Sequence, residues 1–451
     1  QGSYPVNDQV LAAVPPDMGV TYYSGTHTYD SSRRPMIYRL LETYARDGWL
    51  GVYPQLDNSW RTVFPFTGPQ FIRARMREFA SKRLQSVTGY ATPSNKFCAF
   101  NVTGLAEWGW NAEGRDENQF ARAWAVRQGI KNVNGFAKWA CLIGPLGWDL
   151  AGGRFPMRLF WDPARSLLEK PTPMTFGQDF LAEIPSEFEL RRNIAQAKKA
   201  LALAHTLERP ECVAESVVVL HAHLFLQALL ALSRLPRVPA NKARLARRLA
   251  ELDAAAEAVV KGLWDWGSAV YPGLAEKPPH RFEETMSVFA QVVGEAYRLA
   301  AEIGVADPRP EWRDRAVGRW TENDFAEHEA ILSFNVTEFV TGTGPYRVMF
   351  RYQSGGYGAD ILSAELVQPQ GGEARRVAFI EPKAWGYGDK APAPHIGRYE
   401  AWNDVRLDVA AVEPGARYEL RVTLGGLPGP GEVPAERRTT RGEICLRRAW
   451  A

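Results

Sequence analysis

Three short β-like segments near the start of the chain are each followed by polar and aromatic side chains. Tyr23 and His27 follow the first segment, Asp57, Asn58 and Trp60 the second, and Tyr90 and Asn95 the third. A pyranose sugar has hydroxyl groups that hydrogen-bond and an apolar face that packs on an aromatic ring. These residue types therefore predict a sugar-binding site. Trp60 or Tyr90 would lie under the apolar face, Asp57, Asn58 and Asn95 would bind the hydroxyls, and Tyr23 and His27 would line the rim.

Each of these side chains also has an ordinary structural role open to it, because polar side chains in loops often cap helices or bind backbone groups. Two acidic residues have the chemistry for general acid–base catalysis, Asp57 and Glu107. Glu107 lies in a predicted helix, where a carboxylate more often forms an ion pair or a cap. Asn101 is interpreted as either a ligand contact or a structural amide. No residue is therefore assigned a catalytic role.

The sequence has no pattern typical of a metal, nucleotide or nucleophilic-triad site. The four cysteines are far apart, with no Cys-x-x-Cys or Cys/His spacing. His221 and His223 are two positions apart and would point to different faces of a helix, which excludes them as a metal-binding pair. Walker, Gly-x-Gly-x-x-Gly and Gly-x-Ser-x-Gly patterns are missing from any strand–helix context. We expect no metal and no cofactor.

Composition excludes several classes of function. The net charge is +3, from 54 basic and 51 acidic residues, so the surface does not favour nucleic acid as a partner. The most apolar run, residues 217–232, is shorter than the ~20 residues needed to cross a bilayer. It is also interrupted by His221, His223 and Gln227, so we interpret it as a buried helix and expect no membrane span.

The elements that must position the predicted site alternate between strands and helices over the first 150 residues. Strands are predicted at residues 20–23, 50–53 and 86–91, and this alternation is typical of a parallel sheet. Helices are predicted from Pro35, from Thr67-Gly68-Pro69 and from Asp116, which would cap its helix. Apolar spacing predicts which side chains face inward: Ile37, Leu40, Leu41 and Tyr44 in the first helix, Phe71, Ile72, Met76 and Phe79 in the second, and Phe120, Trp124 and Val126 in the third.

The rest of the chain divides into a helical and a β-rich part. Residues 185–320 form long amphipathic segments rich in Ala, Leu and Arg, punctuated by Pro236, Pro239 and Pro278. After residue 325 apolar residues alternate with polar ones, as at Tyr346, Val348 and Phe350. Gly/Pro-rich turns separate these runs, so the pattern predicts a two-sheet β-sandwich.

Four segments resemble the last strand and last helix of the (β/α)8 barrel in bacterial hexosaminidase-like and hyaluronidase-like glycoside hydrolases: 90–95 (YATPSN), 100–103 (FNVT), 106–111 (AEWGWN) and 116–124 (DENQFARAW). Segments 22–29 and 51–58 would then end the sixth and seventh strands. Segments 348–355 and 359–366 are similar to the β-sandwich modules at the C-termini of such proteins. The resemblance implies residues 1–165 as the C-terminal part of a barrel, 166–325 as a helical domain and 326–451 as a β-sandwich module.

The resemblance also implies that part of the barrel lies elsewhere. A complete barrel has eight strands and about 250 residues, whereas three strands are predicted here. Hydrolases of this type carry their acidic pair after the fourth strand, so the catalytic acids are expected upstream of this chain or on a partner. A partner chain or a second copy would then complete the barrel, since a three-stranded sheet leaves an unpaired edge.

Two classes of function stay open at this point. The first is a carbohydrate-active protein, part of a glycoside hydrolase that acts on a glycan with amino sugars or uronic acids. The second is a non-catalytic extracellular glycan-binding or self-assembling structural protein that has the sugar-site loops without the acids. Whether the chain is an enzyme depends on the missing strands. In both cases a glycan is the expected ligand, and the expected location is secreted, periplasmic or cell-surface.

Overall fold

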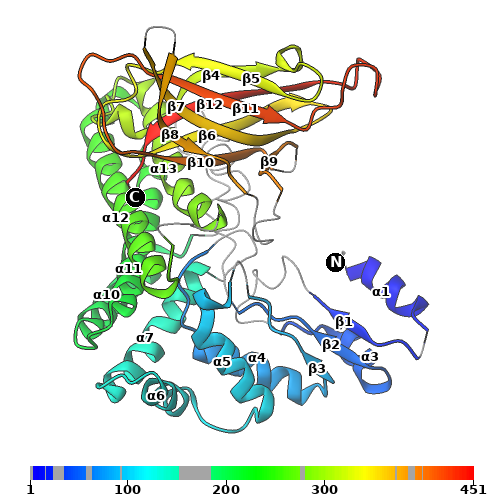
Figure 1. The fold of residues 1–451 in the computed structure, drawn as a ribbon. Coiled ribbons are helices and arrows are strands. Elements are labelled where there is room, and N and C mark those ends of the chain that lie inside the picture. The colour runs from blue at the N-terminus through cyan, green and yellow to red at the C-terminus, as the bar shows by residue number, and fades with distance from the viewer. Residues whose placement is uncertain are drawn as a thin grey trace. The chain divides into compact units, whose positions relative to one another are not determined.

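The computed structural model describes residues 4–15, 17–23, 35–56, 63–91, 94–151, 184–274, 280–370, 373–383, 392–398 and 400–450. It combines helices with one parallel and two antiparallel sheets, so the chain is a mixed α and β protein (Figure 1). Its contacts define two compact units, which we describe separately. Unit 1 comprises Gln1–Arg158, Leu181–Leu230 and Gly262–Glu276, and unit 2 comprises Leu159–Phe180, Ala231–Lys261 and Lys277–Ala451.

Unit 1 contains the parallel sheet that the strand–helix alternation predicts. Its strands are β1 (Val20–Tyr22), β2 (Leu50–Val52) and β3 (Ser86–Val87), in the order β1-β2-β3. Leu50 and Val52 are fully buried on the central strand, as is usual when helices cover a parallel sheet. A helix, α1 (Tyr4–Ala13), precedes the sheet.

Two helices follow the first two strands: α3 (Arg39–Asp47) and α4 (Pro69–Ser81). The inward face predicted for α4 is confirmed, since Phe71, Ile72, Met76 and Phe79 are all buried. The prediction for α3 is wrong in two details. The helix begins at Arg39 and not at Pro35, and Leu40 is exposed while Ile37, just before the helix, is buried. The short helix therefore presents a narrower apolar face than the spacing indicated.

Three more helices complete the first 151 residues: α5 (Ala99–Trp110), α6 (Glu117–Arg127) and α7 (Val133–Ala151), with the 3-10 turn η1 (Asn95–Cys98) before α5. Asp116 caps α6 as predicted, by accepting a hydrogen bond from the Gln119 amide at 2.7 Å. Val126 was predicted to face inward, and that prediction is wrong, because Phe120, Ala121 and Ala125 form the buried stripe and Val126 is exposed.

The helical region consists of α10 (Glu187–Ala204), α11 (Pro210–Ser233), α12 (Lys242–Val270) and α13 (His280–Ala301), with the 3-10 turns η3 (Pro239–Asn241) and η4 (Pro310–Trp312). In the described part of the chain, α11 alone is long and apolar enough to cross a membrane, and 72% of its most apolar stretch is buried. These residues therefore do not form a protein with several membrane spans.

Unit 2 contains two antiparallel sheets that share one core (Figure 1). The first has the order β10-β6-β12-β4, from β4 (Arg315–Thr321), β6 (Gly344–Gly355), β10 (Trp402–Val409) and β12 (Thr440–Arg448). The second has the order β5-β11-β7-β8, with β9 on β7; its strands are β5 (Ala330–Asn335), β7 (Ala359–Gln370), β8 (Glu373–Ile380), β9 (His395–Ile396) and β11 (Glu419–Gly425). A 3-10 turn, η5 (Glu322–Asp324), follows β4.

The predicted alternation of inward residues agrees with this shared core. Tyr346, Val348 and Phe350 of β6 are buried in it, as are Leu420 and Val422 of β11. The sandwich begins earlier than the change in sequence pattern, because β4 lies upstream of residue 326. The two units each combine several stretches of the chain, so the division at residues 165 and 325 stays a prediction.

The other face of the first sheet is also covered, by helix α13 along strand β10. The covered face carries charges, and they are paired. Arg347 on β6 lies 3.0 Å from the Glu283 carboxylate of α13. Arg447 on β12 donates to Ser287 of α13 at 2.8 Å, and its Nε lies 2.9 Å from Asp314. A buried ionic network therefore attaches this helix to the sheet.

Candidate functional site

The carboxyl ends of the three parallel strands meet at one edge of the sheet in unit 1. The chain stays in register beyond the strands: the Thr88 amide donates to the Val52 carbonyl and the Tyr90 amide to the Pro54 carbonyl, both at 2.9 Å. Gln55 and Tyr90 form a further parallel bridge. Because the backbone is fixed here, the first residues after each strand have defined positions. This is the edge where ligands bind in parallel strand–helix folds.

Three side chains from the three strand ends meet at this edge. The Gln55 amide Nε2 donates to the Tyr23 hydroxyl at 2.9 Å. The Tyr23 and Tyr90 rings lie 5.7 Å apart between centroids, tilted by 35°. Gln55 is buried, whereas both tyrosines are partly exposed. The structure thus brings together two of the predicted site residues, Tyr23 and Tyr90, with Gln55, a polar residue after the second strand that was not assigned to the site.

Asn95 lies at the start of η1, which comes before α5. The Asn95 side chain is exposed, and no described contact joins it to the two tyrosines. The turn is held by Phe97, whose ring stacks on Tyr271 with centroids 5.2 Å apart. The Lys96 ammonium lies 4.9 Å from the centre of the Tyr271 ring. Asn95 is therefore presented to solvent by an anchored turn.

The remaining predicted site residues are His27, Asp57, Asn58 and Trp60, and they lie outside the described residues. Their predicted places after the first and second strands remain predictions. The described edge accordingly consists of Tyr23, Gln55 and Tyr90.

Two polar residues that the sequence left with alternative roles have structural ones. The Asn101 amide is fully buried and donates to the backbone carbonyls of Leu56 and Phe66, each at 2.8 Å. Its oxygen accepts from the Gly68 amide at 3.0 Å. Glu107 forms an ion pair with Arg115 at 2.8 Å on the surface of α5. Asn101 is a structural amide that fixes the loop after the second strand, and Glu107 is a paired surface carboxylate.

Sequence reasoning missed one acid of unit 1 with a strongly shifted pKa, Glu215 of α11. Its carboxylate accepts from the Thr67 amide at 2.9 Å and from the Thr67 hydroxyl at 2.8 Å. Burial raises the pKa of Glu215 to about 7, against the two Thr67 hydrogen bonds, which favour the charged form. Thr67 lies just before α4, so this acid fixes the start of that helix. Two glutamates, Glu211 and Glu215, near the start of a long apolar run were the available signal.

The two histidines of α11 do not form a metal site. His223 is buried with Nδ1 at 2.7 Å from the Val219 carbonyl and Nε2 at 3.4 Å from the Asn193 amide nitrogen. Burial lowers the pKa of His223 to about 4. Within the residues that the structure covers, no group of three or more His, Cys, Asp or Glu side chains is placed to hold a metal ion.

The side chains in the described part of the sheet edge are suited to binding a ligand. It offers two aromatic rings, two phenol hydroxyls and an amide, which can stack on an apolar ring face and exchange hydrogen bonds with hydroxyl groups. Neither a protein-family model nor a curated protein matches this chain. The resemblance to hexosaminidase-like and hyaluronidase-like barrels therefore rests on the sequence motifs quoted above.

Proposed function

We propose that the edge formed by Tyr23, Gln55 and Tyr90 binds a glycan that contains amino sugars or uronic acids. The observation that carries this proposal is the meeting of the two tyrosine rings at the carboxyl edge of a parallel sheet, held by the Gln55 amide. A partly exposed tyrosine pair has an apolar surface for a sugar ring and hydroxyls for its edges. His27, Asp57, Asn58, Trp60 and Asn95 would extend the same surface.

We further propose that this edge is the substrate-binding part of a larger active site. In the (β/α)8 hydrolases that the motifs resemble, the last strands bind substrate and earlier strands carry the catalytic acids. The three strands here would be the sixth to eighth of such a barrel. The acids would come from the strands that complete it, upstream or on a partner chain or second copy. We further propose a secreted, periplasmic or cell-surface location, where glycans of this kind are found.

The alternative is a non-catalytic glycan-binding or structural protein of the same location. It predicts the same binding surface, so glycan binding supports both forms of the proposal. Hydrolysis distinguishes them, because only an assembly that supplies the missing acids would cleave the bound glycan.

Binding is tested by isothermal titration of the full chain with an N-acetylglucosamine tetrasaccharide and a hyaluronan tetrasaccharide. We expect saturable binding of at least one of them. Tyr90→Ala should weaken binding about tenfold, which corresponds to roughly 1.4 kcal/mol. Tyr23→Phe keeps the ring but removes the acceptor of the Gln55 hydrogen bond, and it should weaken binding by a smaller factor.

Trp110→Ala is the matched control. Trp110 is the last residue of α5 and is 93% exposed, so its removal deletes a large exposed ring without disturbing the core. Binding by this variant should equal that of the wild type. The proposal is contradicted if neither oligosaccharide binds, or if Tyr90→Ala binds as well as the wild type does.

A further inference from the structure

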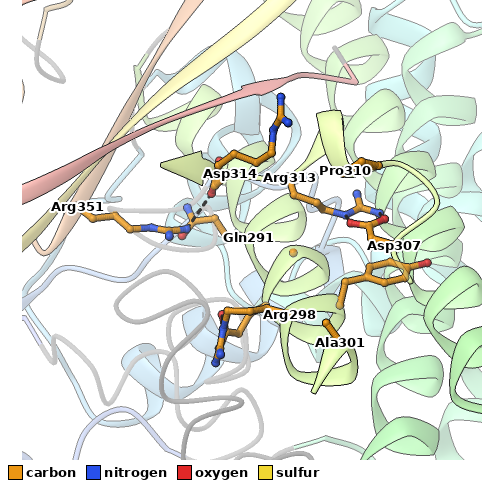
Figure 2. A pocket seen from close by; sticks show the side chains of 12 residues that line it. Gln291, Arg298, Ala301, Asp307, Pro310, Arg313, Asp314 and Arg351 are labelled. Carbon is orange, nitrogen blue, oxygen red and sulfur yellow. Dashed lines mark hydrogen bonds and ion pairs between the residues drawn. The ribbon is translucent and has the colours of Figure 1, made fainter. Parts of the chain in front are cut away.

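A second place in the molecule has the composition of a ligand site, and it lies entirely in unit 2. It is a cavity of about 240 Å³ beside helix α13, bordered by the segment that leads into β4 and by Arg351 of β6. Figure 2 shows the side chains that line it, with the ion pair between Arg351 and Asp314 drawn as a dashed line. The lining contains four arginines and three carboxylates, which is an unusual density of charge for so small a space.

Most of these charges are already paired. Arg351 lies 2.9 Å from Asp314, and Arg313 lies 3.0 Å from Asp307 and 2.8 Å from Asp253. Arg298 donates to Glu295 at 2.8 Å. The protein has therefore neutralised each lining carboxylate with an arginine.

Arg315 is the exception. Its guanidinium lies 4.1 Å from the centre of the Phe339 ring, and among the described residues no carboxylate lies within ion-pair distance of it. A guanidinium stacked on a ring keeps its edge for bidentate contact with a planar oxyanion. The cavity thus has one arginine more than it has carboxylates, and that arginine is held in place.

Three buried donors in the cavity wall also have no acceptor among the described residues. They are Gln291 Nε2, Arg313 Nη1 and Arg315 Nε. A buried donor without a partner costs about 1–3 kcal/mol, but these three nitrogens are closed off from solvent, so a ligand in the cavity would not contact them directly. The expected ligand therefore presents acceptors to Arg315, the lining arginine without a carboxylate partner among the described residues.

The volume of the cavity and the charges that line it restrict the class of ligand further. Sites for drug-sized molecules occupy about 300–1,000 Å³, so 240 Å³ suits a molecule of about one ring. The paired carboxylates of Glu295 and Asp307 can accept hydrogen bonds from hydroxyl groups, which a hydroxylated carboxylate has and a bare inorganic anion lacks. We propose that this cavity binds a single sugar acid, a uronic acid, with its carboxylate on Arg315 and its hydroxyls toward the lining carboxylates.

This inference is independent of the sheet edge in unit 1, and titration of the full chain tests it. Glucuronate is expected to bind, whereas glucose, which lacks the carboxylate, is expected to bind at least tenfold more weakly. Arg315→Gln should weaken glucuronate binding at least tenfold. Arg319→Gln is the control, because Arg319 lies on the same strand, is 75% exposed and is 3.9 Å from its nearest acid. Trp110→Ala, at an exposed position outside both proposed sites, should leave glucuronate binding unchanged.

A second measurement needs no variant. Phenylglyoxal modifies accessible arginines, and mass spectrometry of the wild-type chain would report how far glucuronate slows the modification of Arg315. Protection of Arg315 but not of Arg319 supports the assignment. The proposal is overturned if glucuronate does not bind, if glucose binds equally well, or if sulfate binds while glucuronate does not. It is also overturned if Arg315 reacts at the same rate with and without glucuronate.

Discussion

The sheet edge of unit 1 and the interface between α13 and the first sheet of unit 2 both bury polar groups, but they satisfy them in different ways. Next to the edge, the Asn101 side chain of α5 binds backbone groups of Leu56, Phe66 and Gly68. At the interface, Arg447 and Arg347 bind the carboxylates of Asp314 and Glu283. Neutral partners fix a loop at the edge, whereas opposite charges fix a helix on a sheet in unit 2.

The difference has an energetic consequence. A buried neutral hydrogen bond contributes about 1 kcal/mol, and its loss leaves neutral groups unpaired. A buried ion pair contributes little net stability, since its attraction offsets the desolvation of both ions, but losing one partner leaves a charge stranded. The two regions should therefore respond to single substitutions by different amounts and with different dependence on pH.

The largest effect is expected from Arg447→Met. This change leaves Asp314 and Asp404 buried without the guanidinium that lies 2.9 Å and 3.5 Å from them. The free energy of unfolding should fall by about 3–5 kcal/mol, measured by urea denaturation of the full chain. Arg319→Met, at a mostly exposed position, should change it by less than about 1 kcal/mol. Equal effects of the two variants would contradict the importance of the buried network.

The next effect concerns Glu215, whose pKa is raised by burial from the ordinary 4.5 to about 7. Between these values the folded state keeps a proton that the unfolded state has lost, so the free energy of unfolding falls as the pH rises through this window. The total change is about 3 kcal/mol. Below about pH 4.5 the protonated Glu215 contributes its full stabilisation of the folded state, and above about pH 7 this stabilisation is lost.

Glu215→Gln removes the titrating group and keeps an oxygen that accepts from Thr67. The difference in unfolding free energy between wild type and variant should therefore change by about 3 kcal/mol between about pH 4 and pH 8, measured by urea denaturation across that range. Parallel pH profiles for the two proteins would mean that Glu215 titrates normally and that the start of α4 is not fixed by a protonated acid.

The sequence predicted best where one physical rule acts alone. The cap at Asp116, the inward face of α4 and the alternation in β6 each follow from local geometry, and the structure contains them. The alternation also predicted that Arg347 points away from the shared core, which it does. It could not predict that Arg347 is buried, because α13 brings Glu283 to it from 64 residues upstream in the sequence.

In the candidate site, too, some features could be predicted from local sequence and others could not. Residues just after parallel strands were expected to converge, and Tyr23 and Tyr90 do so because the sheet order places their strands on either side of β2. The bond from Gln55 to Tyr23 depends on rotamers that no sequence spacing encodes. The burial of Glu215 beside Thr67 joins segments 148 residues apart. The arginine-rich cavity of unit 2 likewise depends on packing between separate elements.

The central claim, that the edge of the parallel sheet binds glycan, is tested most directly by hydrogen–deuterium exchange of the full chain with and without saturating N-acetylglucosamine tetrasaccharide or hyaluronan tetrasaccharide. We predict slower exchange in the peptides that contain the amides of Tyr53 and Leu56 and of Thr88 and Tyr90, which form the bonds at this edge. Peptides from β12 in unit 2 should be unchanged with the N-acetylglucosamine tetrasaccharide. No slowing at the edge with either oligosaccharide, or slowing confined to unit 2, would contradict the claim.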